Sequence, residues 1–180
     1  YGNATELPVT ENTALGVAES PYARTKQMGE DMIRDFAKVS QEQFVLLRYF
    51  NPVGAHPSGL TGEDSSEAPT AVVPRITGTA LGKFAHFTVF GNDYPTRDGT
   101  CIRDYIHVMD IAHAHTLAMA YMQQNKVKQG QAEVFNLGTG NGITVLEAIE
   151  SFERVTGAKL NWSFGDRKST RLNSSHLVIS

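Results

Sequence analysis

The sequence has one cysteine, no long apolar run and no excess of basic residues, and each shortage excludes a class of protein. Because Cys101 is alone, an internal disulfide framework is excluded, which fits a reducing compartment and a cytoplasmic protein. No run reaches the roughly 18 apolar residues that span a bilayer, so we expect no membrane partner. The net charge of −3 gives no electrostatic reason to expect a nucleic acid partner.

The sequence does contain enough apolar material for a packed core, since 41% of its 180 residues are hydrophobic and 19% are charged. This composition excludes a wholly disordered chain, and the length is typical of about one domain. The chain begins at Tyr1 rather than at a methionine. We therefore expect it to be part of a longer polypeptide, called the parent protein below.

Residues 166–180 differ in character from the rest of the chain. They show neither the helical nor the strand period of apolar residues. The string from Asp166 to His176 resembles the in-frame translation of a sequencing-library adapter. We expect 166–180 to be an artefactual, disordered tail and 1–165 to be the genuine segment.

Apolar periodicity and turn residues predict alternating helices and strands. Ser20-Pro21 supplies an N-cap and a first-turn proline, and Thr144-x-x-Glu147 is a capping box. A loop rich in Pro, Gly and Ser is expected over 51–69, and loops of that length tend to be functional. The predicted helices cover 20–39, 70–84, 110–122 and 144–156, and the predicted strands cover 43–49, 87–90, 133–137 and 159–164. Residues 101–108 are expected to form a strand or an extended loop. This alternation predicts an α/β fold with a largely parallel sheet.

Tyr22 and Lys26 are the first candidates for chemistry. Residues four apart share one face of a helix, so the phenol and the ammonium can approach one ligand together. A phenol ionises near pH 10, and a nearby cation favours its charged form, which suits a general acid or base. The alternative is chance, because the chain has six tyrosines and the Tyr-x-x-x-Lys spacing is short.

Two further candidates follow predicted strands. Asn51 comes directly after the apolar run 43–49, and ligands of open α/β sheets bind beyond the carboxyl ends of strands. Its alternative role is that of a turn-forming Asn before Pro. Arg103 can direct its forked guanidinium at a phosphate, or it can form an ion pair with Asp104.

Three other patterns give only weak indications of a functional site. His113 and His115 point away from each other on a helix, so no metal site is expected there. Cys101 has no evident base for nucleophilic chemistry. Gly138-Thr-Gly140-Asn-Gly142 imitates a dinucleotide-binding loop, but Ile143 stands where the third glycine is needed.

Four motifs occur together and in order: Ser-Pro-Tyr-x-x-x-Lys at 20–26, Leu-Arg-Tyr-Phe-Asn-Pro-Val-Gly-Ala-His at 47–56, the segment 90–108, and Phe-Asn-Leu-Gly-Thr-Gly at 135–140. They resemble the family of UDP-glucose 4-epimerases, within the extended short-chain dehydrogenases/reductases. The resemblance covers essentially all of 1–165 and implies part of a Rossmann-like parallel sheet plus a smaller α/β substrate-binding domain.

The resemblance implies interconversion of UDP-glucose and UDP-galactose, a step of galactose metabolism, through a transient 4-keto sugar with tightly bound NAD. Tyr22 would take the proton of the sugar 4-hydroxyl, and Lys26 would hold the nicotinamide ribose. Phe50 would lie against the cofactor, and Tyr22 would touch both NAD and the sugar.

The same resemblance assigns substrate contacts. Asn51 and Arg103 would hold the diphosphate, and the strand residues Thr88, Val89 and Phe90 would present backbone groups to the uracil. Val72 would contact substrate, but Ala71 replaces an amide of the family's Pro-Asn-Asn-Leu, which leaves the sugar preference open. The helix that carries Tyr22 and Lys26 would help to form a homodimer.

Two alternatives remain open. The parent protein can be another extended short-chain dehydrogenase that modifies a nucleotide sugar, such as a 4,6-dehydratase or a UDP-N-acetylhexosamine 4-epimerase. The 180-residue chain itself can be an inactive truncated fragment, because a Gly-x-Gly-x-x-Gly loop and the family's serine partner of the tyrosine are missing from it.

Overall fold

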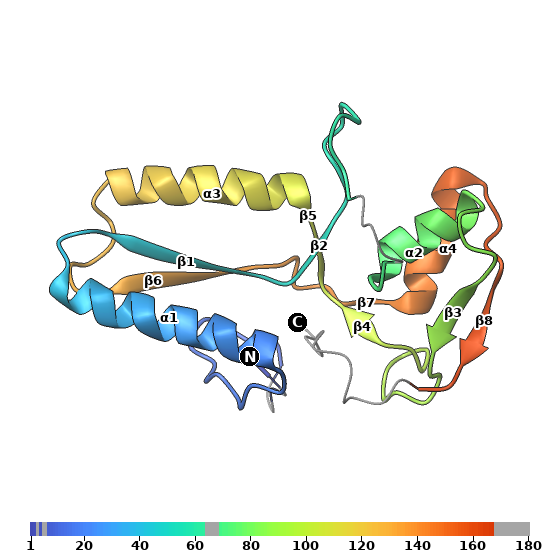
Figure 1. The fold of residues 1–180 in the computed structure, drawn as a ribbon, viewed down its shortest axis with the longest axis horizontal. Coiled ribbons are helices and arrows are strands. Elements are labelled where there is room, and N and C mark those ends of the chain that lie inside the picture. The colour runs from blue at the N-terminus through green and yellow to red at the C-terminus, as the bar shows by residue number, and fades with distance from the viewer. Residues whose placement is uncertain (3, 5–6, 64–68, 168–180) are drawn as a thin grey trace.

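The computed structural model describes residues 1–2, 4, 7–63 and 69–167 of the chain (Figure 1). Most of the expected tail, 168–180, lies outside the described residues. The described part contains these elements: α1 (Pro21–Val39), β1 (Phe44–Tyr49), β2 (Asn51–Val53), α2 (Val72–Ala80), β3 (Phe87–Phe90), β4 (Ile102–Arg103), β5 (Tyr105–His107), α3 (Val108–Gln123), β6 (Ala132–Leu137), β7 (Ile143–Thr144), α4 (Val145–Thr156) and β8 (Trp162–Gly165).

The strands form four two-stranded ladders among the described residues. The pairs β1–β6, β2–β5 and β3–β8 are parallel, and β4–β7 is antiparallel. In Figure 1 the β1–β6 ladder lies between α1 on one face and α3 on the other. Helices on both faces of a mostly parallel arrangement confirm the α/β expectation and explain why β1 is an almost continuous apolar run.

Helix α1 forms where the sequence predicted it. The Ser20 hydroxyl oxygen accepts a hydrogen bond from the Ala23 N–H at 3.1 Å, and Pro21 occupies the first helical position, where it needs no N–H partner. In Figure 1 the first turns of α1 lie at the same end as the carboxyl ends of β1 and β6. The helix therefore runs antiparallel to the strands it covers, and its N-terminus points toward the sheet edge at which α/β proteins bind ligands.

The hydrophobic core lies on the side of the molecule away from the β1–β6 ladder, where α2 and α4 pack against β3 and β8 (Figure 1). Its buried members are Ile76, Phe87, Val89, Val145, Ile149 and Leu160. Helix α4 begins with the predicted capping box. The Glu147 N–H donates to the Thr144 hydroxyl at 3.1 Å, and the Thr144 N–H donates to the Glu147 carboxylate at 2.9 Å. Gly157 ends α4 in the left-handed conformation, with φ of 72°.

Two expectations for extended segments need correction. The first residues of the predicted loop 51–69 form β2, because Asn51–Val53 pair in register with Tyr105–His107 of β5. The segment 101–108, expected as one strand or an extended loop, forms two short strands, β4 and β5, which are divided at Asp104 and pair with different partners. Segments two or three residues long show no alternation that could distinguish them from a loop.

Two helices also differ from their predicted bounds. Helix α2 ends at Ala80 rather than near Phe84, because Gly82 takes a left-handed φ of 74° and the Lys83 N–H turns back to the Gly78 carbonyl at 2.8 Å. Helix α3 begins at Val108, two residues early, because the His107 ring accepts from the Met109 N–H at 3.2 Å and acts as the N-cap. In the described part of the chain, no helix combines the length and apolar character needed to cross a membrane.

Candidate active site

Tyr22 and Lys26 lie together on the first two turns of α1, as their spacing predicted. The Lys26 ammonium nitrogen is 5.2 Å from the centroid of the Tyr22 ring, within the range of a cation–π contact. The Tyr22 side chain is 55% exposed. The phenol and the ammonium are therefore adjacent and open to a ligand at the ligand-binding edge of the sheet.

An ion pair that the sequence analysis missed fixes α1 against β1. The Arg48 guanidinium donates to both oxygens of the Glu30 carboxylate, from Nε at 2.7 Å and from Nη2 at 2.6 Å. Glu30 lies one turn beyond Lys26 on the same face of α1, and Arg48 lies on β1 three residues before Asn51. A sequence signal existed, because a charged residue inside an apolar strand needs a partner.

The charges of this pair stabilise each other. The Arg48 guanidinium hydrogen-bonds the Glu30 carboxylate and lowers the pKa of that carboxyl below its usual value. The same contact raises the pKa of Arg48. Arg48 also donates to the Tyr1 hydroxyl at 2.8 Å, and that hydroxyl donates to the Asn136 side chain on β6 at 2.5 Å. The pair thus ties the N-terminal segment, α1, β1 and β6 into one unit.

Asn51 and Arg103 are linked through Asp104, the residue between β4 and β5. The Asn51 backbone N–H and side-chain Nδ2 both donate to the Asp104 carbonyl, each at 3.0 Å. Arg103 immediately precedes Asp104, is half-buried, and donates from Nη1 to the Ile102 carbonyl at 2.8 Å. The two residues expected to hold a diphosphate therefore belong to one bonded junction.

Phe50 is part of the same junction. Its N–H donates to the Leu137 carbonyl at 3.1 Å, where β6 ends. Its ring lies so close to Gly138 that a side chain there would overlap it. Phe50 is half-buried and directly precedes Asn51, so it lies at the carboxyl end of β1, the end at which open α/β sheets bind ligands.

The remaining expected substrate residues lie on α2 and β3. In Figure 1 these elements are beyond β4, on the side away from α1. Val72 is the first residue of α2, and Thr88, Val89 and Phe90 pair in parallel with Ser163, Phe164 and Gly165 of β8. Val89 is buried in the core, and its backbone groups face β8, as do the Phe87 and Gly91 N–H groups, which donate to the Asn161 and Gly165 carbonyls. The described contacts do not join this group directly to Tyr22 and Lys26.

The glycine-rich loop after β6 binds an internal carboxylate. The Thr139 N–H and hydroxyl donate to Asp104 Oδ1 at 2.9 and 2.7 Å, and the Gly140 N–H donates to Asp104 Oδ2 at 3.1 Å. These donors are the groups with which such a loop would hold a phosphate. Residues 138–142 therefore do not fit a dinucleotide pyrophosphate, in agreement with the sequence interpretation.

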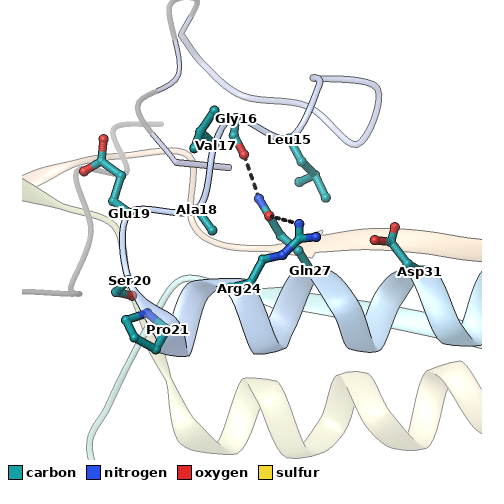
Figure 2. Close-up of a pocket in the computed structure, with 10 residues that line it drawn as sticks. All are labelled: Leu15, Gly16, Val17, Ala18, Glu19, Ser20, Pro21, Arg24, Gln27 and Asp31. Atoms are coloured by element: carbon teal, nitrogen blue, oxygen red, sulfur yellow. Dashed lines mark hydrogen bonds between the residues drawn. The ribbon is translucent and has the colours of Figure 1, made fainter.

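A groove of about 710 Å³ lies against another face of α1 (Figure 2). It is lined by Leu15–Pro21 and by Arg24, Gln27 and Asp31, and the Gln27 side chain bridges it by donating to the Gly16 carbonyl at 2.7 Å. None of the expected site residues lines it. Across residues 1–2, 4, 7–63 and 69–167, no three His, Cys, Asp or Glu side chains are arranged to hold a metal ion.

Comparison with known proteins decides the family. The model of the NAD dependent epimerase/dehydratase family matches residues 1–138. The chain belongs to this family. The chain therefore shares the family's α/β fold, and the Tyr22–Lys26 pair lies inside the matched region.

Curated relatives agree. The chain is 46% identical to UDP-glucose 4-epimerase of Bacillus subtilis (strain 168) over 169 residues, covering 93% of this chain and 48% of that protein. It is 47% identical to UDP-glucose 4-epimerase 2 of Arabidopsis thaliana over 161 residues, covering 89% of this chain and 45% of that protein. The chain thus spans about half the length of the curated relatives it matches.

Solved structures resemble the chain to a similar degree. A UDP-glucose 4-epimerase from Stenotrophomonas maltophila, with bound NAD and formylated UDP-arabinopyranose, superposes with a TM-score of 0.86 at 43% identity, covering 93% of this chain and 49% of that one. A UDP-glucose 4-epimerase from Bifidobacterium longum, in complex with NAD⁺ and UDP, gives a TM-score of 0.83 at 40% identity, with coverage of 93% and 49%. These values confirm the expected fold class.

Proposed function

We propose that residues 1–165 belong to a UDP-glucose 4-epimerase that interconverts UDP-glucose and UDP-galactose with bound NAD. The observation that carries the proposal is the Lys26 ammonium, 5.2 Å from the ring of the exposed Tyr22 at the N-terminal end of α1. Relatives about 46% identical over most of this chain bear that enzyme's name. The proposal extends to the whole parent protein, since the chain spans about half of those relatives.

The chain's residues fit the nicotinamide end of NAD. Tyr22 and Lys26 are exposed side by side, and Phe50 lies at the carboxyl end of β1, so an apolar ring and two polar groups are available there. The loop 138–142 does not fit the pyrophosphate, because Asp104 takes its donors. When bound, NAD would supply the acceptor and donor of hydride at the sugar carbon.

In the proposed reaction, Tyr22 removes the proton from the sugar 4-hydroxyl as the carbon is oxidised. It returns the proton to the 4-oxygen after the 4-keto sugar has rotated to present its other face. Lys26 holds the nicotinamide ribose from its place beside the Tyr22 ring. Positioned acid–base groups of this kind contribute typically 10²–10⁴-fold to rate. Proton transfer is thus the chain's own contribution to chemistry.

Binding of the nucleotide part would use the rest of the expected set. Arg103 and Asn51 would donate to the diphosphate from the junction at Asp104. By the alternation of the parallel ladder, the backbone groups of Thr88 and Phe90 point away from β8 and would meet the uracil, with Val89 packed in the core between them. Val72 would approach the sugar nucleotide from the start of α2.

Hexosamine derivatives are a second substrate class. Ala71 is the N-cap of α2 and brings no amide where the family motif has one. A related structure, 34% identical with a TM-score of 0.71, is a UDP-Glc/GlcNAc 4-epimerase from Campylobacter jejuni. We therefore include UDP-N-acetylglucosamine in the test of function.

Dimerisation through α1 is also part of the proposal. Its outer face exposes Met28, Met32, Phe36 and Val39, which are between 49% and 82% accessible. An apolar stripe on a surface helix is typical of a face that a second helix covers. Sedimentation of the parent protein as a dimer, and of a Met32→Glu variant as a monomer, would agree with it; a monomeric wild type would contradict it.

The test of function compares the parent protein with the 180-residue chain. We expect the parent protein to convert UDP-galactose to UDP-glucose and to release NAD on denaturation. We expect the chain alone to show neither, because its glycine-rich loop offers no pyrophosphate site. Clear turnover by the isolated chain would overturn the expectation for the chain, and a parent protein inactive on UDP-galactose and UDP-N-acetylglucosamine would overturn the proposed function.

A further inference from the structure

Asp104 is a fully buried carboxylate that lies where the chain passes from one ladder to another. Its exposed fraction is 0%, although acidic side chains are almost never fully buried unless they are paired. The residue before it ends β4, which pairs with β7, and the residue after it begins β5, which pairs with β2. Asp104 thus separates two strands that belong to different sheets.

The carboxylate accepts hydrogen bonds from three donors of one loop. Asp104 Oδ1 accepts from the Thr139 N–H at 2.9 Å and the Thr139 hydroxyl at 2.7 Å, and Oδ2 accepts from the Gly140 N–H at 3.1 Å. Gly138 allows this approach, because a Cβ there would overlap Oδ2.

The backbone carbonyl of the same residue holds Asn51. It accepts from the Asn51 N–H and from Asn51 Nδ2, each at 3.0 Å. Two bonds from one residue to one carbonyl fix both the backbone and the amide orientation of Asn51. Arg103 is directly bonded to Asp104 in sequence, so a shift of the Asp104 backbone moves both residues.

We propose that Asp104 is a positioning residue that sets the diphosphate-binding geometry of Asn51 and Arg103 by anchoring their junction to the loop 138–140. This inference rests on the proposed function. It assigns the glycine-rich loop a purpose as well, since the loop holds an internal carboxylate that in turn orders the substrate-binding side chains. Asp104 touches no substrate in this account.

The test uses UDP as the probe and the parent protein as the host. Asp104→Asn keeps the size but places an NH₂ group against backbone donors, so it breaks at least one bond of the anchor. Thr139→Val removes the hydroxyl that donates to Asp104 and that also makes two longer bonds to the Asn141 backbone, and Thr139→Ser restores that hydroxyl. Ile149→Ala, in the core of α4 and 2% exposed, destabilises the fold without touching the junction.

We expect Asp104→Asn to weaken UDP binding and raise the KM for UDP-galactose by about tenfold or more, since a tenfold change corresponds to the loss of about one hydrogen bond. The same variant should keep its NAD content and change kcat by less than about threefold. Thr139→Val should weaken UDP binding by roughly threefold, and Thr139→Ser should bind like the wild type. Ile149→Ala should lower Tm with UDP affinity unchanged.

Each outcome bears on either the positioning role of Asp104 or the proposed function. UDP affinity that stays at the wild-type value in Asp104→Asn, or that falls only in step with Tm and NAD content, overturns the positioning role. If Asp104→Asn does not fold, Thr139→Val decides in its place, with weakened UDP binding in support and unchanged binding against. A wild-type parent protein that binds no UDP contradicts the proposed function itself, which separates that failure from failure of the inference.

Discussion

Arg48 and Glu30 meet in a two-pronged ion pair between β1 and α1, with both guanidinium–carboxylate bonds between 2.6 and 2.7 Å. Their side chains are only 13% and 18% exposed. Arg–carboxylate pairs of this geometry are stronger and more specific in orientation than single contacts. The pair therefore fixes how far α1 slides along β1, and with it the position of Tyr22 relative to Phe50 and Asn51.

Replacing Glu30 by Gln should destabilise the protein. The variant leaves the Arg48 guanidinium partly buried without a carboxylate, and we expect the free energy of unfolding to fall by about 1–3 kcal/mol. Asp35→Asn is the matched control, because its ion pair with Lys38 is exposed and should contribute less than about 0.5 kcal/mol. Urea denaturation of both variants measures the difference, and equal losses would show that burial of the Glu30 pair adds nothing.

The stability of α4 should depend on acid through Glu147. The Arg97 guanidinium and the Thr144 N–H lower the pKa of the Glu147 carboxyl from 4.5 to about 2. A carboxyl whose pKa is lower when folded stabilises the fold above pH 4.5, and that contribution is lost as the pH falls toward 2. The difference in Tm between the wild type and Glu147→Gln should thus be largest above pH 4.5 and shrink on acidification.

Since the Glu147 side chain is 40% exposed, the effect should be small and should weaken in 1 M salt. Thermal melts across this pH range, at low and high salt, measure it. A Tm difference that does not change with pH would contradict the assigned pKa shift.

Removing the Tyr22 hydroxyl should abolish most turnover of the parent protein. We expect Tyr22→Phe to lower kcat by about 10²–10⁴-fold, because proton transfer loses its carrier, while bound NAD remains. Tyr49→Phe is the control, since Tyr49 is 49% exposed on β1 and has no assigned role. UDP-galactose turnover and NAD content are measured together; a Tyr22→Phe variant with wild-type turnover would remove Tyr22 from catalysis.

Two glycines should respond to alanine in opposite ways. A Cβ at Gly138 would overlap the Asp104 carboxylate and the Phe50 ring, so we expect Gly138→Ala to cost about 1–3 kcal/mol of stability. A Cβ at Gly29, inside α1, has no atom within 4 Å, so Gly29→Ala should stabilise the helix by about 0.5–1 kcal/mol. Urea titration compares them, and a neutral Gly138→Ala would mean that the junction has room to adjust.

The sequence predicted features that depend on neighbours along the chain. Tyr22 and Lys26 share a helix, so their approach follows from a spacing of four, and the Thr144–Glu147 capping box is equally local. The Asp104 contacts join residues 35 and 36 positions away in one direction and 53 in the other. No local period encodes such pairings, so the anchor, the strand β2 and the break between β4 and β5 were found only in three dimensions.

The loop 138–140 also bears on how nucleotide sites are recognised. A row of backbone N–H groups attracts any anion, whether a phosphate from solution or an oxygen pair supplied by the polypeptide. The glycine spacing by itself therefore indicates an anion-binding loop and does not identify which anion it binds. In this chain the loop binds the carboxylate of Asp104. A feature usually associated with cofactor binding thus links two segments that are far apart in the sequence.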